Sequence, residues 1–547
     1  MRRIWYPLAL LSIFFASLAV RLIPPIVNSV WGPDTGENYY LANYFALHLS
    51  LPAHYLGFGM TYTEFPAVYI ITGLAARLTG LSTFMVAELI MPFLTSFLIF
   101  PIAGIVLSLT GRHDIALASA AFYAGAAPVV GHTSILASDT LGEFLLVYFY
   151  YFCSRRGRLT LPAVLTAIAM VPAYHVGTIM LLLFAYCLLA LHASFSSKKQ
   201  AIAWLIFIFA ISTEAWVYWL TYAKVFLEIF ILGNPHLKLA EAILVPYLLA
   251  LLVYFLSPKV IPASLRALKG LSHFRGVLPI SGLVVVPFLI FSFTGLPSES
   301  LLPSPLLMLF VPTAFIAVAG GLFISQFTQE HEMLLPFVIA FLLTLLIIIV
   351  GVLTNIAYLV PARVIEFAIL LLCPFAGYAV FRMEKVRRGV GIAAVCILLV
   401  STGVSMATIG QVISPSKMGL MPYQDVEASV WLKWYTQDNV TVASDHPLSS
   451  IAFGIGERNA TWEIGGYPIF SARNSEALQL ALQNTSTPAG VRETNVLFID
   501  AYMIDAGNYY PTQTTIPMSG ALLKALSSHA FILIYSNGFT SAYVYVR

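Results

Sequence analysis

Long apolar stretches separated by short polar connections fill the first three quarters of the chain. Their lengths approach the roughly 20 residues that a helix needs to cross a bilayer. They predict about thirteen transmembrane helices, at 4–20, 83–110, 115–131, 140–153, 160–173, 177–193, 201–222, 243–256, 277–294, 305–324, 334–353, 364–381 and 390–409. A shorter run at 65–79 predicts a re-entrant or interfacial helix. We therefore expect residues 1–410 to form one polytopic α-helical membrane domain.

The pattern changes after residue 410. From Gln411 to Arg547, polar residues, turn signals and short alternating runs replace the apolar stretches. This composition is typical of a domain that faces water, so we expect a second domain over residues 411–547.

The composition agrees with a membrane protein and excludes other classes. The chain is 59% hydrophobic and only 10% charged, whereas soluble domains are roughly 45–50% apolar. A net charge of +3, with the basic residues in short loops, excludes a nucleic-acid partner, which would need a continuous basic surface. The four cysteines show no paired spacing and fall in or beside apolar runs, so they predict buried thiols rather than disulfides or a zinc site.

Clusters of basic residues in the short loops predict the orientation in the membrane. Positive residues gather on the cytoplasmic side of short loops, and here they mark alternate connections. The markers include Arg2, Arg3, Lys198 and Lys199, and the strongest are Arg155, Arg156 and Arg158. They predict a multi-pass plasma-membrane protein with a cytoplasmic N-terminus and an extracytoplasmic domain at 411–547. Three Asn-x-Ser/Thr sequons, at Asn439, Asn459 and Asn484, fall on that outer side.

This orientation gathers the unusual ionisable residues on the outer side. Charged and histidine side chains at the ends of membrane spans cost free energy, so a collection of them on one face is a site hypothesis. The residues concerned are Asp34, Glu37, Glu64, His132, Asp139, Glu143, His175 and Arg363.

Asp34 and Glu37 open an aromatic, amphipathic stretch, "PDTGENYYLANYF". Their spacing of three predicts neighbouring positions on an interfacial helix. Asp34 fits two roles, a helix N-cap or a ligand and catalytic group. Glu37 fits either a solvated helix face or a substrate contact.

Asp139 and Glu143 are four residues apart in "SDTLGEF", so both lie on one face of the first turn of a span that begins near Asp139. Like charges in this arrangement repel unless a cation or a shared proton relieves them. A divalent cation, Mg²⁺ or Mn²⁺, held by this pair and Asp34 would explain the arrangement. The alternative is that Asp139 caps the helix and Glu143 faces a nearby Arg or Lys.

Three further residues carry weaker hypotheses. Arg363 stands beside Pro361 at the outer mouth of a span, where its planar donors suit a phosphate, although interfacial snorkelling explains it equally. His175 at a span end and Glu64 before an apolar run fit either a structural role or a substrate contact.

Taken together, these features resemble the GT-C superfamily of membrane glycosyltransferases, and within it the catalytic subunits of oligosaccharyltransferases. The resemblance lies in the basic start, the long outer first loop with an early acid, the second outer acidic motif and the outer C-terminal domain. It implies a GT-C membrane domain followed by an extracytoplasmic α/β domain. It covers nearly the whole chain in architecture and about five short segments in motifs.

The resemblance also implies roles for particular residues. Asp34 matches the first-loop acid that these enzymes use as a metal ligand or catalytic base, and Asp139 falls where they carry a second acidic metal-binding motif, with Glu143 a looser match. Arg363 is similar to the arginine that contacts the donor phosphate. The stretch "AYHVGTIM" around His175 looks like a span end of archaeal members, and "VWLKWYTQDNVTVASD" resembles the family's helix-then-strand entry into the outer domain.

Two departures shape the predicted function. The WWDYG motif that reads the acceptor sequon is absent, with "VASDHPLSS" in its place, and the fifth outer loop is short, with only Glu299. We therefore predict transfer of a sugar from a polyprenyl (dolichyl)-phosphate carrier to a glycan, lipid or protein acceptor. The alternatives are oligosaccharyltransferase-like transfer of a lipid-linked glycan to protein and, in another class, a transporter or lipid flippase.

Overall fold

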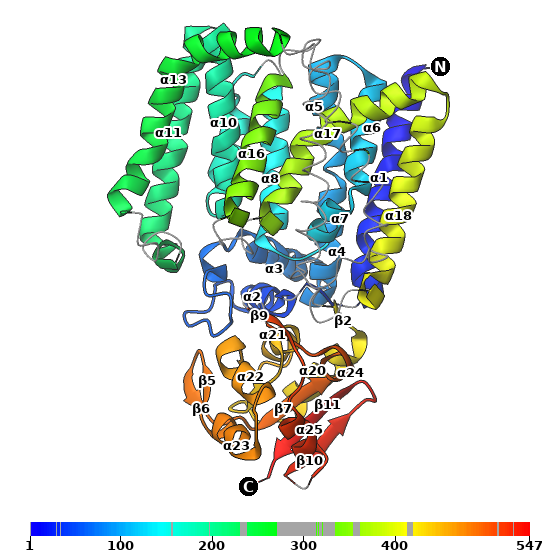
Figure 1. Ribbon diagram of the computed structural model, residues 1–547, viewed down its shortest axis with the longest axis vertical. Helices are drawn as coiled ribbons and strands as arrows, with labels where there is room; N and C mark the ends of the chain where they lie inside the picture. The colour runs from blue at the N-terminus through cyan, green and yellow to red at the C-terminus, as the bar shows by residue number, and fades with distance from the viewer. Residues whose placement is uncertain are drawn as a thin grey trace. The chain divides into compact units, whose positions relative to one another are not determined.

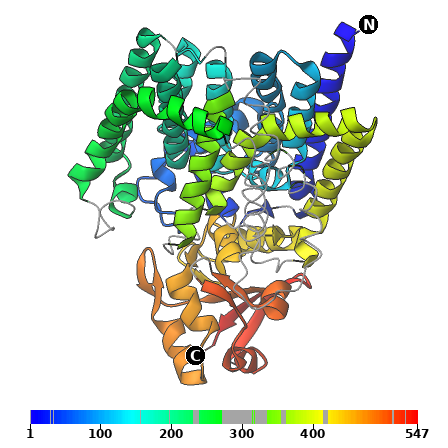
Figure 2. The same ribbon diagram turned by 45° about the horizontal axis from the view of Figure 1, so that its top comes forward.

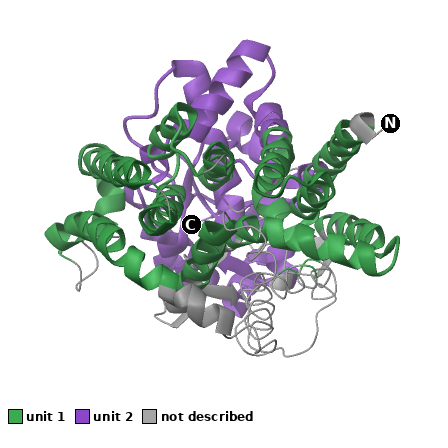
Figure 3. Cartoon of the chain, turned by 90° about the horizontal axis from the view of Figure 1, so that it is seen from above, with its two compact units in different colours: residues 1–21, 92–133, 138–406 green, residues 22–91, 134–137, 407–547 purple. Residues whose placement is uncertain are grey.

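The computed structural model describes residues 2–28, 30–32, 34–154, 157–195, 197–229, 238–270, 313, 316, 320, 334–353, 361–412, 420–510, 513–528 and 530–546. The predicted spans 277–294 and 305–324 lie outside the described residues, apart from positions 313, 316 and 320, and so does the side chain of Arg363. The chain divides into two compact units, which Figure 3 colours separately. Unit 1 comprises residues 1–21, 92–133 and 138–406, and unit 2 comprises residues 22–91, 134–137 and 407–547.

Apolar helices make up most of the described residues before residue 413 (Figure 1). They are α1 (Arg2–Asn28), α4 (Thr83–Ser96), α5 (Ile99–Thr110), α6 (His113–Gly125), α7 (Ala127–Thr133), α8 (Ser138–Ser154), α9 (Leu161–Met170), α10 (His175–Phe195), α11 (Lys198–Thr221), α12 (Lys224–Leu227), α13 (Leu239–Gly270), α16 (Leu335–Leu353), α17 (Pro361–Val386) and α18 (Val390–Val412).

The described helices follow the predicted apolar runs closely, but they do not establish the predicted number of spans. Within the described residues, six helices are long and apolar enough to cross a membrane. A seventh candidate is the pair α6 and α7, which is bent by 61° at Ala126. Pro128 lies in the first turn of α7, where its missing N–H breaks no helical bond. The helices α8 and α9 are shorter, with 17 and 10 residues.

Neighbouring helices of unit 1 pack against one another. The helices α10, α11 and α13 lie side by side, as Figures 1 and 2 show, and α17 packs against α6 and α16. Three of the cysteines, Cys153, Cys187 and Cys373, are buried as predicted. The prediction is wrong for Cys396, which is exposed because α18 turns that face outward.

Unit 2 joins a mixed α/β region to part of the first loop. Its strands are β1 (Val30–Trp31), β2 (Leu420–Met421), β3 (Thr441–Ala443), β4 (Asn459–Thr461), β5 (Thr485–Thr487), β6 (Gly490–Arg492), β7 (Val496–Asp500), β8 (Asn508–Tyr510), β9 (Gln513–Ile516), β10 (Phe531–Ser536) and β11 (Thr540–Tyr545). Its helices are α2 (Thr35–His48), η1 (Tyr62–Glu64), α3 (Ala67–Thr79), α20 (Tyr423–Tyr435), α21 (His446–Gly454), α22 (Glu463–Phe470), α23 (Ser475–Gln483), α24 (Ala501–Ala506) and α25 (Gly520–Leu526).

A five-stranded sheet forms the core of the α/β region, in the order β10-β11-β7-β3-β4. The strand β3 runs parallel to β4 and β7, whereas β11 runs antiparallel to β7 and β10. All residues of β3 and β7 are buried, because central strands of such a sheet are covered on both faces. The predicted water-facing domain is therefore an α/β domain.

The first loop is built into the same unit as this domain. The strand β1 pairs antiparallel with β2, with Val30 opposite Met421. The helix α2 packs against α21 so closely that a Cβ added at Gly36 would lie 2.3 Å from the carbonyl oxygen of Ser450. Only a residue without a side chain fits this crossing. This close packing at Gly36 brings the start of α2 near the start of α21.

Candidate functional site

Asp34 precedes the first turn of α2, but its carboxylate does not cap the helix. Instead, Asp34 Oδ1 lies 2.7 Å from His446 Nε2, and Asp34 Oδ2 accepts a hydrogen bond of 2.6 Å from the Tyr62 hydroxyl. The side chain keeps 30% exposure. Of the two roles predicted for Asp34, the capping role is wrong, because neither oxygen bonds a helix amide.

Glu37 lies one turn further along α2 and is completely buried. Its Oε2 accepts hydrogen bonds from the Tyr55 hydroxyl at 2.5 Å and from the Gly59 N–H at 3.1 Å. Its Oε1 has no hydrogen-bond partner among the described residues. The expectation that Glu37 could lie on a solvated face is therefore wrong, because the segment before η1 folds over it.

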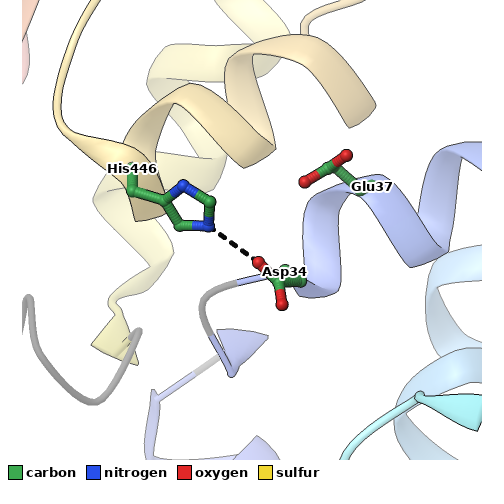
Figure 4. Close-up of side chains that lie close together, drawn as sticks. All are labelled: Asp34, Glu37 and His446. Atoms are coloured by element: carbon green, nitrogen blue, oxygen red, sulfur yellow. Dashed lines mark hydrogen bonds and ion pairs between the residues drawn. The ribbon is translucent and has the colours of Figure 1, made fainter. Parts of the chain in front are cut away.

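His446 is the first residue of α21, and Asp445 caps this helix through a hydrogen bond from the Leu448 N–H. Its imidazole is buried, and the ring of Phe58 meets it edge-on at 4.8 Å between ring centroids. Nε2 faces Asp34, whereas Nδ1 has no hydrogen-bond partner in the described part of the chain. Figure 4 shows the Asp34, Glu37 and His446 side chains together, from α2 and α21.

Burial and charge shift the proton affinities in this group. Burial raises the pKa of Glu37 to about 7, and the Asp34 carboxylate adds to the rise, while the Tyr55 hydroxyl opposes it. Burial lowers the pKa of His446, but the hydrogen bond and charge of Asp34 outweigh that effect, so its pKa is raised overall. Both shifts therefore favour a proton on Glu37 and a proton on His446 near neutral pH.

The same three residues fit a divalent cation. Each offers one ligand atom, and the three atoms lie within 4.8 Å of one another. Carboxylate oxygens and an imidazole nitrogen form the ligand set of Zn²⁺ and Mn²⁺ sites, whereas Mg²⁺ prefers oxygen alone. The buried Glu37 Oε1, without a described partner, is the atom that a cation or a proton would satisfy.

A second group of ionisable residues lies in unit 1. His132 Nδ1 is 4.0 Å from Asp139 Oδ2 and 4.0 Å from Glu366 Oε2. Glu366 belongs to α17 and is buried, whereas His132 and Asp139 are partly exposed. Thr140 donates its hydroxyl to the His132 carbonyl and its N–H to Asp139 Oδ1. The predicted residues His132 and Asp139 therefore lie close to Glu366, an acid that was not predicted.

Glu143 makes different contacts from Asp139, although the two lie on one helix. It is buried and accepts a hydrogen bond of 2.9 Å from the Tyr123 hydroxyl. The guanidinium of the buried Arg21 lies 5.2 Å from the centroid of the Tyr123 ring and donates to Thr133 and Ser17. Asp34 and the pair Asp139 and Glu143 belong to different units, so the cation shared among them stays a prediction.

The remaining predicted residues are placed as follows. His175 starts α10, is nearly buried and packs on the ring of Phe226 at 4.5 Å. Glu64 ends η1 and is half-buried. Arg363 lies in the first turn of α17, one turn before Glu366. Their substrate roles stay predictions.

Sequence reasoning missed His446, Arg21 and Glu366. Glu366 and Arg21 carried a usable signal, because an acid or arginine inside an apolar run is expensive and usually has a partner. The sequence "SDHPL" marks a helix start through its capping Asp and early Pro. Nothing local, however, links His446 with an acid 412 positions away.

No protein-family model matches the chain, and no curated protein matches its sequence. Among solved structures, the chain is similar to the Archaeoglobus fulgidus oligosaccharyltransferase tethered to an acceptor peptide containing the NVT sequon, with a TM-score of 0.60 and 13% identity over 99% of this chain and 74% of that one. The complex of this protein with Zn and sulfate gives a TM-score of 0.58 and 13% identity over 98% and 73%. The mycobacterial arabinofuranosyltransferase AftD gives 0.47 and 12% identity over 100% and 40%.

The likeness to the oligosaccharyltransferase extends over nearly the whole chain, whereas a TM-score of 0.47 does not establish a shared fold. The resemblance predicted from the sequence is therefore confirmed at the level of the fold: the chain has the fold of the archaeal oligosaccharyltransferase.

Proposed function

We propose that this protein is a membrane glycosyltransferase that moves a sugar from a polyprenyl-phosphate-linked donor to an acceptor at the extracytoplasmic face of the plasma membrane. The observation that carries the proposal is the Asp34 carboxylate. It stands at a helix start without capping it, partly exposed and held by His446 and Tyr62. The shared fold makes a glycosyltransferase the first function to test for such a group.

In the proposed reaction, an acceptor oxygen attacks the anomeric carbon of the donor sugar. A bond forms between these two atoms, the bond from the anomeric carbon to the phosphate oxygen breaks, and the acceptor proton passes to Asp34. The contacts from His446 and Tyr62 fix the carboxylate in one orientation, which removes the entropic cost of aligning it. Arg363 would contact the departing phosphate, and Asp139 with Glu143 would hold a cation that offsets the negative charge on that phosphate.

A divalent cation fits this proposal, with Asp34, Glu37 and His446 as the residues that would hold it. When bound, such a cation would offset negative charge during transfer. The mixed oxygen and nitrogen ligands favour Zn²⁺ or Mn²⁺ over Mg²⁺. Its role can be tested apart from transfer, by metal content and by thermal unfolding.

One second candidate has an observation of its own. The Archaeoglobus fulgidus oligosaccharyltransferase has been solved with an acceptor peptide. Transfer of a lipid-linked glycan to an Asn-x-Ser/Thr peptide is therefore the alternative reaction, and a peptide in the acceptor panel distinguishes the two.

The test uses the purified full-length protein with polyprenyl monophosphate and pyrophosphate sugars, each offered with glycan, lipid and peptide acceptors. We expect Asp34→Asn, which keeps the shape and removes the base, to lower transfer by about 100-fold or more. The matched control is Asp505→Asn, at an exposed acid of α24. Equal activity of both variants and the wild type would exclude Asp34 as the reacting carboxylate.

A further inference from the structure

Three aromatic side chains follow one face of α2 beyond the acid group. Tyr40, Tyr44 and His48 are spaced four residues apart, so their rings lie along one side of the helix. The ring centroids are 6.1 Å apart for Tyr40 and Tyr44 and 4.4 Å apart for Tyr44 and His48. The Tyr55 ring, 6.3 Å from that of Tyr40, extends the row at its other end. We name these four residues the aromatic track.

The aromatic track begins at the candidate site. The hydroxyl of Tyr55 donates the 2.5 Å hydrogen bond to Glu37, whose candidate ligand oxygen lies within 4.8 Å of those of Asp34 and His446. Tyr40 in turn packs against Phe453 of α21, with ring centroids 4.7 Å apart. The track is therefore continuous with the group that holds Asp34, and all of it belongs to unit 2.

The track is open to solvent and carries polar groups. Tyr40 and Tyr44 are half-buried and His48 is exposed, so the three rings are not part of a closed core. The hydroxyls of Tyr40 and Tyr44 contact no hydrogen-bond partner among the residues that the structure describes. Each ring thus offers an apolar face and a tip with free hydrogen-bonding capacity.

We propose that the aromatic track binds the saccharide chain of a glycan acceptor and directs its terminal hydroxyl toward Asp34. This inference rests on the proposed function and narrows its acceptor. A sugar ring has an apolar face of C–H groups and a rim of hydroxyls, and therefore matches an aromatic face with a polar tip. A row of similar rings also matches a chain of similar sugar units.

The other acceptors and the donor tail fit the track less well. A polyprenyl tail would bury the hydroxyls of Tyr40 and Tyr44 without hydrogen bonds, which costs free energy. A peptide acceptor commonly pairs with a strand edge or fills pockets of varied shape, and the track lies on a helix with repeated rings.

The experiment measures binding of linear hexose oligosaccharides of increasing length to the full-length protein, by saturation-transfer NMR. We expect affinity to rise with length in the wild type and to fall about tenfold in Tyr44→Leu, which removes the ring. Tyr44→Phe keeps the ring and is expected to stay within about threefold of the wild type. Tyr423→Leu, at an exposed tyrosine of α20 outside the track, should bind like the wild type. Thermal unfolding checks that each variant is folded.

Three results would overturn the inference. They are the absence of oligosaccharide binding to the wild type, equal binding by Tyr44→Leu and the wild type, and a loss in Tyr44→Leu that affects only a sequon peptide or polyprenyl phosphate. Transfer assays separate this inference from the proposed function. If the protein transfers sugar to a peptide or lipid but binds no saccharide, the inference about the aromatic track is wrong and the proposed function stands. If the protein binds saccharides but consumes no polyprenyl-linked donor, the proposed function is wrong. With both correct, Tyr44→Leu raises KM for the saccharide and leaves kcat near the wild-type value.

Discussion

Replacing Gly36 with alanine tests whether the closeness of α2 and α21 sets up the site. An added Cβ would lie 2.3 Å from the Ser450 carbonyl oxygen and 2.4 Å from its carbon. Both are backbone atoms, so no side chain can turn aside to make room. Ordinary contact begins near 3.4 Å. The two helices must therefore separate by about 1.1 Å at this point, a typical overpacking response.

A separation of this size would break the contact at the centre of the site. The distance from Asp34 to His446 would grow from 2.7 Å to about 3.8 Å, which is beyond hydrogen-bond range. Overpacking costs roughly 1–3 kcal/mol, and alanine returns about 1 kcal/mol through its higher helix propensity. The net loss of unfolding free energy is thus about 0–2 kcal/mol, so we expect Gly36→Ala to fold. Because a misplacement of about 1 Å can lower a rate about 100-fold, transfer should fall by that order.

The assay compares transfer rates and thermal unfolding of Gly36→Ala and the wild type. Gly520→Ala is the matched control, because a Cβ at this first residue of α25 meets nothing within 4 Å. It should retain both rate and stability. If Gly36→Ala transfers sugar as fast as Gly520→Ala, the contact between Asp34 and His446 is not needed for function, and the reasoning is refuted.

Three other outcomes are expected. Zn²⁺ or Mn²⁺ at about 100 times its Kd should raise the unfolding free energy of the chelator-treated protein by about 2.7 kcal/mol. In thermal unfolding, His446→Ala should lose this response to the metal. An equal response of His446→Ala and the wild type would exclude His446 as a ligand. Burial raises the pKa of Asp500 from 3.8 to about 6, so its contribution to stability is present below pH 4 and is lost as the pH rises to 6. In Asp500→Asn, which can still cap α24, the unfolding free energy should decline less steeply between pH 4 and pH 6. An unchanged slope of unfolding free energy against pH would contradict the raised pKa of Asp500. Arg21→Ala removes the buried donors to Thr133 and Ser17 and should lower the unfolding free energy by about 3 kcal/mol in a denaturation assay. A variant as stable as the wild type would contradict this role of Arg21.

The membrane helices were predictable because their signal is local. Apolar length alone places the span at 83–110, which the structure forms as Thr83–Thr110, and the last span at 390–409, which forms α18. The short helix at 65–79 was likewise predicted, as α3. One exception is the break at Ala126, where a span predicted as one helix bends by 61°.

The candidate site was predictable only in part, because its geometry depends on contacts between distant segments. The charge of Asp34 and its predicted position on the outer side placed it among the candidates, and the spacing of three residues put Glu37 on the adjoining turn. The burial of Glu37 and the contact with His446, however, follow from the packing of α2 on α21 through Gly36 and Gly454, which no periodicity reveals. His132 and Asp139 were both named as candidates, but their closeness to each other and to Glu366 of another helix was not predicted.

The pairing of β1 with β2 and of Asp34 with His446 has a consequence for biosynthesis. These contacts join segments that leave the ribosome at opposite ends of translation, with Val30 opposite Met421 and Asp34 beside His446. Contacts of such high sequence separation form late in folding. During synthesis, Asp34 can therefore meet Tyr62 early, but it meets His446 only after the described helices α4 to α18 have been made. A chain truncated before α21 would lack His446, so the candidate site would stay incomplete, and under the proposed function such a product would transfer no sugar.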